Sequence, residues 1–92
     1  MITKAQFIKE MAKRGNLKEV ESERLFDLFL DTLKYCIKEY GGVKFRGFGN
    51  FVVKEHKERM GRNPKNGNPA VIPKYKTVKF HVGEVFKDSL ND

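Results

Sequence analysis

Ninety-two residues with one cysteine, no tryptophan and a net charge of +7 describe a small basic protein. This length allows one domain, and a chain this short commonly needs a disulfide, a metal or a partner chain to complete its burial. Cys36 is alone, which excludes an intrachain disulfide, and no residues have the spacing of metal ligands. We therefore predict self-association, and neither a cofactor nor a metal.

The sequence carries neither a secretory signal pattern nor an apolar run of membrane-spanning length. We therefore expect a cytoplasmic protein in a reducing compartment.

Residues 1–14 predict a first helix. Thr3 is the expected N-cap, and Gln6 three positions later completes a capping box. One apolar face at helical spacing is formed by Phe7, Ile8, Met11 and Ala12. Gly15-Asn16 is expected to end the helix.

Residues 17–40 predict a longer second helix that stops at Gly41-Gly42. Its apolar residues cover a wider part of the helix surface than the single stripe that a surface helix needs. We infer that one flank contacts the first helix and the other a second subunit, with Phe29 and Leu33 in the dimer core.

Residues 43–51 predict a short strand, a turn at Gly47-Phe48-Gly49 and the start of another strand. The turn can direct three phenylalanine rings into one cluster, to which Phe80 returns later in the chain. We expect these rings to be core, on the dimer side: Phe45, Phe48, Phe51 and Phe80.

Two stretches rich in β-branched and aromatic residues, 51–58 and 70–80, flank a basic segment at 59–69. They predict a long two-stranded arm with a Pro-bearing tip. Asn66-Gly67 is typical of a type I′ hairpin turn, with positive φ at both positions. The competing interpretation is a disordered surface loop.

The positive charge is concentrated on this arm. Residues 54–79 hold eight Lys or Arg against two Glu, a net of +6, whereas the remaining residues hold eleven against ten, a net of +1. Such a stripe favours a polyanion partner. An anionic membrane would need a broad apolar face that an arm lacks. The arm cations are Lys54, Lys57, Arg59, Arg62, Lys65, Lys74, Lys76 and Lys79.

Residues 83–90 predict a short third helix, with Val85, Phe86 and Leu90 facing inward. The predicted fold is α+β: a two-helix body, a three-stranded antiparallel sheet with a long β-arm, and a C-terminal helix. We divide this single domain into a helical dimerisation part (1–46), the sheet and arm (47–82) and the last helix (83–92).

No grouping of residues suggests an enzyme. His56 and His81 are far apart in sequence without acidic or thiol neighbours at ligand spacing, and no serine lies in a nucleophile motif. Two other binding functions stay open: a module that binds acidic protein, and RNA binding, although the paired aromatic platform of single-strand readers is missing.

Several of these motifs together resemble the HU/integration host factor family of bacterial DNA-bending proteins, and the resemblance runs from end to end. The residues that carry it are Gly47-Phe48-Gly49-Asn50-Phe51, Arg59-x-Gly61-Arg62-Asn63-Pro64, Gly67, Phe80 and Gly83. The resemblance implies an intertwined dimer whose two arms reach around double-stranded DNA in the bacterial nucleoid.

The resemblance also implies roles for individual residues. Pro64 would intercalate between base steps and kink the duplex, while Arg59, Arg62 and Asn63 would lie along the minor groove with little sequence specificity. Arg46 resembles an arginine of one integration host factor subunit, which suggests a sequence-selective heterodimer as the alternative. Lys44 replaces the acidic partner of that arginine, which favours non-specific binding.

Overall fold

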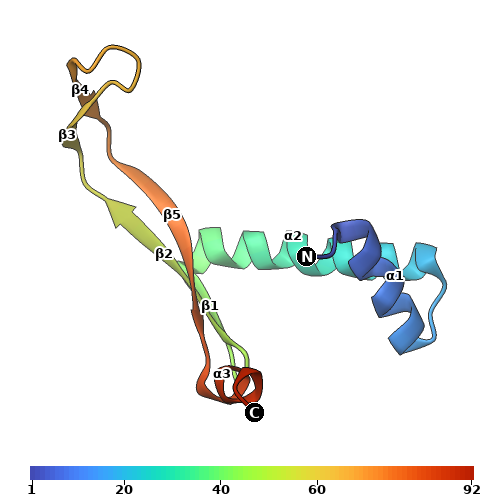
Figure 1. The fold of residues 1–92 in the computed structure, drawn as a ribbon. Helices are drawn as coiled ribbons and strands as arrows, with labels where there is room; N and C mark the ends of the chain where they lie inside the picture. The colour runs from blue at the N-terminus through green and yellow to red at the C-terminus, as the bar shows by residue number, and fades with distance from the viewer. The chain divides into compact units, whose positions relative to one another are not determined.

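The computed structural model describes residues 1–92 as three helices and five strands (Figure 1). Their order along the chain is α1 (Lys4–Gly15), α2 (Glu19–Tyr40), β1 (Gly42–Phe45), β2 (Gly49–His56), β3 (Arg59–Arg62), β4 (Pro69–Ile72), β5 (Tyr75–Val82) and α3 (Glu84–Leu90). Residues 1–35 and 36–92 form two compact units.

The predicted capping box at the start of α1 is confirmed. Thr3 Oγ1 accepts a hydrogen bond from the Gln6 backbone N–H (3.2 Å), and Gln6 Oε1 accepts one from the Thr3 N–H (2.9 Å). At the other end, Asn16 is left-handed (φ 54°), and the Leu17 N–H donates to the Ala12 carbonyl. Because Leu17 completes this cap, α2 begins at Glu19 and not at the predicted residue 17.

In the first unit, α1 packs on the early turns of α2, as predicted for one flank of that helix. Ser22 is fully buried, and its hydroxyl donates to the Ile8 carbonyl at 2.8 Å. The rings of Phe7 and Phe26 lie 5.4 Å apart. Lys4 pairs with Asp27 at 3.1 Å on the surface.

In the second unit, β1, β2 and β5 form an antiparallel sheet with β2 in the centre. Directly paired residues point to the same face of a sheet, and neighbours along a strand point to opposite faces. The registers Val43↔Phe51↔Phe80 and Val53↔Val78 therefore define an apolar face.

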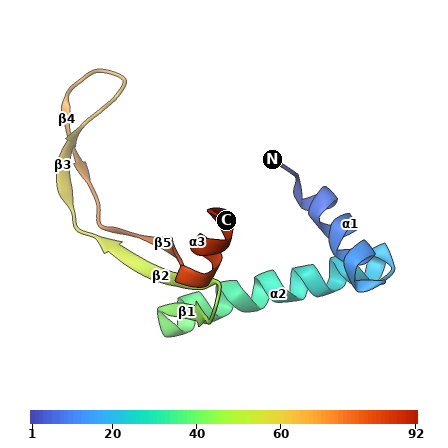
Figure 2. The ribbon, with the colours of Figure 1, turned by 60° about the horizontal axis from the view of Figure 1, so that its bottom comes forward.

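A cluster of phenylalanine rings packs on this face around Phe48, as predicted. Phe48 lies 5.1 Å from Phe80 and 5.4 Å from Phe86, and Phe51 lies 4.9 Å from Phe80. Figure 2 shows α3 beside the end of the sheet where β1 turns into β2. The prediction for α3 was right only for Phe86: Val85 and Leu90 are each 68% exposed, since this chain alone offers them no second layer.

Gly49 meets β5 so closely that a methyl group does not fit. A Cβ atom there would lie 2.5 Å from the His81 carbonyl oxygen and 2.6 Å from the Phe80 ring. We predict that Gly49→Ala lowers the melting temperature by about 5 °C or more, the effect of roughly 1 kcal/mol of overpacking. Thermal unfolding followed by circular dichroism measures it.

Gly61→Ala is the matched control for that substitution, because its Cβ would meet only the flexible end of Ile72. Equal melting temperatures for Gly49→Ala and the wild type would contradict the predicted close approach.

Candidate nucleic-acid interface

The arm is a single two-stranded ribbon whose strand pairing is interrupted once, by a short gap. The β2–β5 ladder ends at His56↔Tyr75, and the β3–β4 ladder resumes in the same register at Arg59↔Ile72. Residues 57–58 and 73–74 face each other across the gap, and Pro73 has no N–H to donate there. The predicted two-stranded arm is confirmed over the alternative of a disordered loop.

The tip differs from the predicted type I′ turn. Gly67 has a positive φ (+71°), but Asn66 does not. The Asn63 N–H donates to the Asn68 carbonyl, and the Gly67 N–H donates to the Asn63 carbonyl, both at 2.8 Å. Four residues, 64–67, therefore form the loop.

Two asparagine side chains explain why this longer loop forms. Asn63 Oδ1 accepts from the Lys65 N–H (2.9 Å), and Asn66 Oδ1 accepts from the Asn68 N–H (3.0 Å). Each side chain replaces a backbone partner, as asparagines in turns commonly do. The first loop residue, Pro64, is exposed at the end of the arm.

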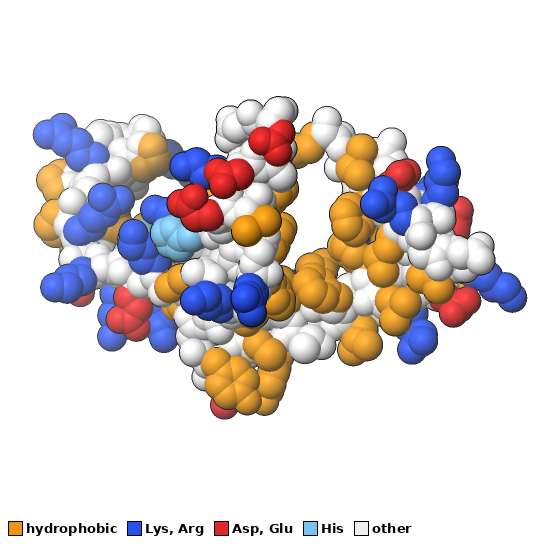
Figure 3. Space-filling view, turned by 90° about the horizontal axis from the view of Figure 1, so that it is seen from below, with side chains coloured by type: hydrophobic (Ala, Val, Ile, Leu, Met, Phe, Trp, Pro, Cys, Tyr) orange, Lys and Arg blue, Asp and Glu red, His pale blue; other side chains and the backbone are white.

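Seven of the eight predicted arm cations have no carboxylate within ion-pair distance. Only Lys76 is paired, with Glu55 at 3.5 Å. Figure 3 shows Lys and Arg side chains gathered over the arm, at the left of the view. Unpaired cations are free to neutralise phosphates without first breaking an internal contact.

These cations do not all lie at the tip. Arg59 and Arg62 are on β3 and Lys65 is in the loop, whereas Lys57 and Lys74 face each other at the gap. Arg46 lies in the β1–β2 turn, at the opposite end of β2 from the tip. The structure therefore separates Arg46 from the arm cations.

A hollow of about 300 Å³ beside the gap was not predicted from the sequence. It is lined by Glu55, His56, Lys57, Lys74, Tyr75 and Lys76. The His56 and Tyr75 rings stack at 4.5 Å, and His56 Nε2 lies 3.1 Å from Thr77 Oγ1. The cross-strand register brings these residues together, and the spacing of residues along either strand does not show it.

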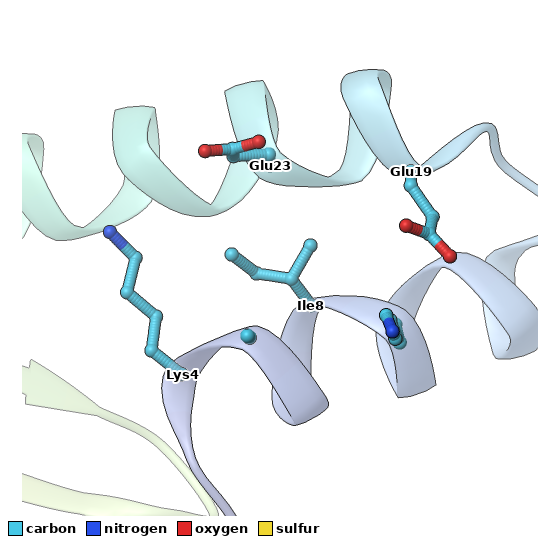
Figure 4. Close-up of a pocket in the computed structure, with 6 residues that line it drawn as sticks. Lys4, Ile8, Glu19 and Glu23 are labelled. Carbon is cyan, nitrogen blue, oxygen red and sulfur yellow. The ribbon is translucent and has the colours of Figure 1, made fainter.

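A second hollow, of about 280 Å³, lies in the first unit. Figure 4 shows Ile8 pointing across it toward α2, with Lys4, Glu19 and Glu23 around it. Lys9 and Ala5 complete the lining, so two cations face two carboxylates. Because these charges balance, the hollow is not expected to bind a polyanion.

No three His, Cys, Asp or Glu side chains gather closely enough to hold a metal ion. None of the helices combines the length and apolarity needed to cross a membrane.

The chain has an α+β fold with a two-stranded arm, and seven cations of that arm have no carboxylate partner. This combination is typical of a protein that binds polyanions by shape and charge. The chain belongs to the bacterial DNA-binding protein family, whose sequence profile matches residues 2–91. Proteins of this family, HU and integration host factor, are architectural DNA-binding proteins and not enzymes. The resemblance found in the motifs is thereby confirmed.

Both branches of the family occur among the similar sequences. DNA-binding protein HU-beta of Neisseria meningitidis is 34% identical over 89 residues, covering 97% of this chain and all of the relative. Integration host factor subunit alpha of Bdellovibrio bacteriovorus is 36% identical over 90 residues, covering 98% of this chain and 82% of the relative.

Solved structures share the fold. HU of Anabaena, crystallised with DNA, superposes with a TM-score of 0.89 at 25% identity, covering 97% of both chains. A variant HU of Thermotoga maritima superposes with a TM-score of 0.70 at 20% identity, covering 97% of this chain and 99% of the other.

Proposed function

We propose that this protein is a histone-like, nucleoid-associated protein that binds double-stranded DNA as a homodimer and bends it with little sequence specificity. The observation that carries this proposal is the two-stranded arm, on which seven cations have no carboxylate partner. The Anabaena HU, which was crystallised with DNA, supports double-stranded DNA as the partner.

The dimer is inferred from the apolar surface of the single chain. Only three apolar residues, Ile8, Ala12 and Ile37, are buried. Phe29, Val78 and Phe80 are 52%, 54% and 39% exposed, although they lie on faces that are otherwise apolar. A second copy that covers these faces would supply the burial that a chain of this length needs. We assign dimerisation to the helical part, residues 1–46, together with the phenylalanine cluster.

DNA bending would combine charge and a wedge. The arm cations release counterions as they neutralise phosphates, so binding weakens as salt rises. Pro64 would enter from the minor groove between two stacked base pairs, with Arg59, Arg62 and Asn63 beside it. Its ring is apolar and carries no N–H that would be left unpaired within the stack. Unstacking costs roughly a few kcal/mol per step and is offset by contacts that only bent DNA makes.

A sequence-selective heterodimer, like integration host factor, is the second candidate. The integration host factor alpha relatives and the exposed Arg46 favour it. Lys44 in place of an acidic partner favours non-specific contact with phosphate. A footprint at one defined sequence, with tight binding lost when that sequence is scrambled, would support this second candidate.

Fluorescence anisotropy of a labelled duplex tests the proposed function. We expect the chain to bind the duplex at physiological salt and unlabelled duplex of any sequence to compete. If an acidic protein or RNA binds tightly and duplex DNA fails to displace it, the proposed function is wrong.

Arg62→Ala should weaken binding to all duplex sequences alike. Arg62 has no carboxylate partner, so its loss removes a phosphate contact and no internal ion pair. We expect the slope of log K against log salt to fall by about one per substituted arm. Lys9→Ala, on α1, is the control and should leave the slope unchanged. A sequence-dependent loss would show instead that Arg62 reads bases.

A further inference from the structure

The long helix α2 exposes an apolar stripe that is separate from its packed flanks. Val20, Leu28 and Tyr35 are 79%, 57% and 60% exposed. Because successive helical residues are about 100° apart, these side chains and those of Arg24 and Asp31 fall within an arc of about 80°. We call these five residues the α2 stripe.

The α2 stripe lies outside both flanks of the helix that have been assigned contacts. The flank that packs on α1 contains Ser22 and Phe26. The flank that we place in the dimer core contains Phe29 and Leu33. Each of these four residues is turned about 100° or more away from every member of the stripe. The three apolar side chains of the stripe would therefore remain in solvent in the proposed dimer.

The two charged residues of the stripe have no ion-pair partner within the chain. Arg24 and Asp31 are both exposed, and neither forms an ion pair. They are separated by about 10.5 Å along the helix axis, at about 1.5 Å per residue, so they do not pair with each other. Arg24 and Asp31 are equally distant from the middle of the stripe, as are Val20 and Tyr35, and Leu28 lies beside the middle.

This arrangement makes the α2 stripe complementary to itself. If two copies of the helix lie side by side in opposite directions, Arg24 of each copy faces Asp31 of the other. In the same register Val20 faces Tyr35, and the two Leu28 side chains meet near the centre. Such a contact is isologous, so each ion pair and each apolar contact occurs twice.

We propose that the α2 stripe is an interface through which a dimer of this protein associates with a second dimer. The contact goes beyond the proposed function and does not require DNA. Each dimer would carry two stripes, so the same contact could join dimers into rows. Because three apolar side chains from each copy make a small interface, we expect the dimers to be separate at micromolar concentration and associated at roughly millimolar concentration.

Sedimentation velocity over a concentration series from about 10 μM to about 1 mM tests this interface. We expect the wild type to sediment as a dimer at the lower end and as larger species, in steps of one dimer, at the upper end. Arg24→Asp replaces two ion pairs per contact with like charges, and should weaken the association about fivefold or more. Lys9→Asp, on α1, changes the net charge equally outside the stripe and should associate like the wild type.

Exchanging the two charges gives the sharpest comparison. Asp31→Arg alone should also weaken the association, whereas Arg24→Asp combined with Asp31→Arg restores opposite charges and should recover the wild-type behaviour. All variants are compared at equal helical content, measured by circular dichroism. An exchanged variant that stays as weak as the single variants would overturn the interface, as would a wild type that remains a dimer at the highest concentration. Both results would leave the proposed function intact.

Discussion

Pro64→Ala should abolish most of the DNA bend while keeping affinity for a straight duplex within about threefold. The arm cations that bind phosphate are unchanged in this variant, but an alanine methyl group is too small to hold two base pairs apart. Energy transfer between dyes at the two ends of a short duplex measures the bend, and anisotropy on the same sample measures occupancy. At full occupancy by the variant, we expect the energy transfer to fall most of the way to the value of free DNA.

Pro69→Ala is the matched control, since Pro69 lies on the same arm within the β3–β4 ladder, opposite Arg62. This variant should bend DNA like the wild type. If Pro64→Ala also keeps the wild-type energy transfer, the proline wedge is wrong and the bend must come from the charged surfaces alone.

Phe29→Asp should prevent the chain from dimerising. Phe29 is a half-exposed ring on the long helix α2, which we place in the dimer core. An aspartate there would bury a charge without a partner, at a cost of several kcal/mol. Sedimentation equilibrium should give the mass of one chain, about 10.7 kDa, where the wild type gives twice that mass. We also expect duplex affinity to collapse, because a single arm cannot hold DNA from two sides.

Lys34→Asp introduces the same side chain elsewhere on α2, at an exposed position turned well away from Phe29. It should remain a dimer. A Phe29→Asp protein that sediments as a dimer would show that this part of α2 does not form the interface.

Features that depend on neighbouring residues were predictable from the sequence. The capping box needs only Thr3 and Gln6, and the structure contains both of its hydrogen bonds. The phenylalanine cluster followed from a Gly-Phe-Gly corner that cannot continue a strand. The predicted start of α2 was two residues too early, because Leu17 completes the cap of α1. From the sequence alone, an apolar residue at that position is equally compatible with the first turn of a helix.

The tip of the arm shows why a dipeptide rule can fail. Asn66-Gly67 favours a two-residue turn in isolation, but Asn63 and Asn66 each bond a backbone N–H two residues later. Those two bonds stabilise a longer loop that starts at Pro64. The fixed φ of proline suits the first central residue of a turn. The position of Pro64 at the end of the arm was predicted; the shape of the loop was not.

The face of the sheet opposite the phenylalanine cluster could not be predicted without the strand register. Lys44, His81 and His56 are distant in sequence, and a shift of one residue in either ladder would move a histidine to the apolar face. For that reason the sequence alone did not show that Lys44, His56 and His81 share one face of the sheet.

Ligase-catalysed ring closure of a duplex shorter than the persistence length of about 150 base pairs is the most direct test of the central claim. Such DNA is too stiff to circularise readily by itself. If a dimer grips and kinks it with two arms, we predict that adding the wild-type protein increases the yield of circles many-fold at saturating occupancy. An unchanged yield of circles, with the protein demonstrably bound, would contradict this account.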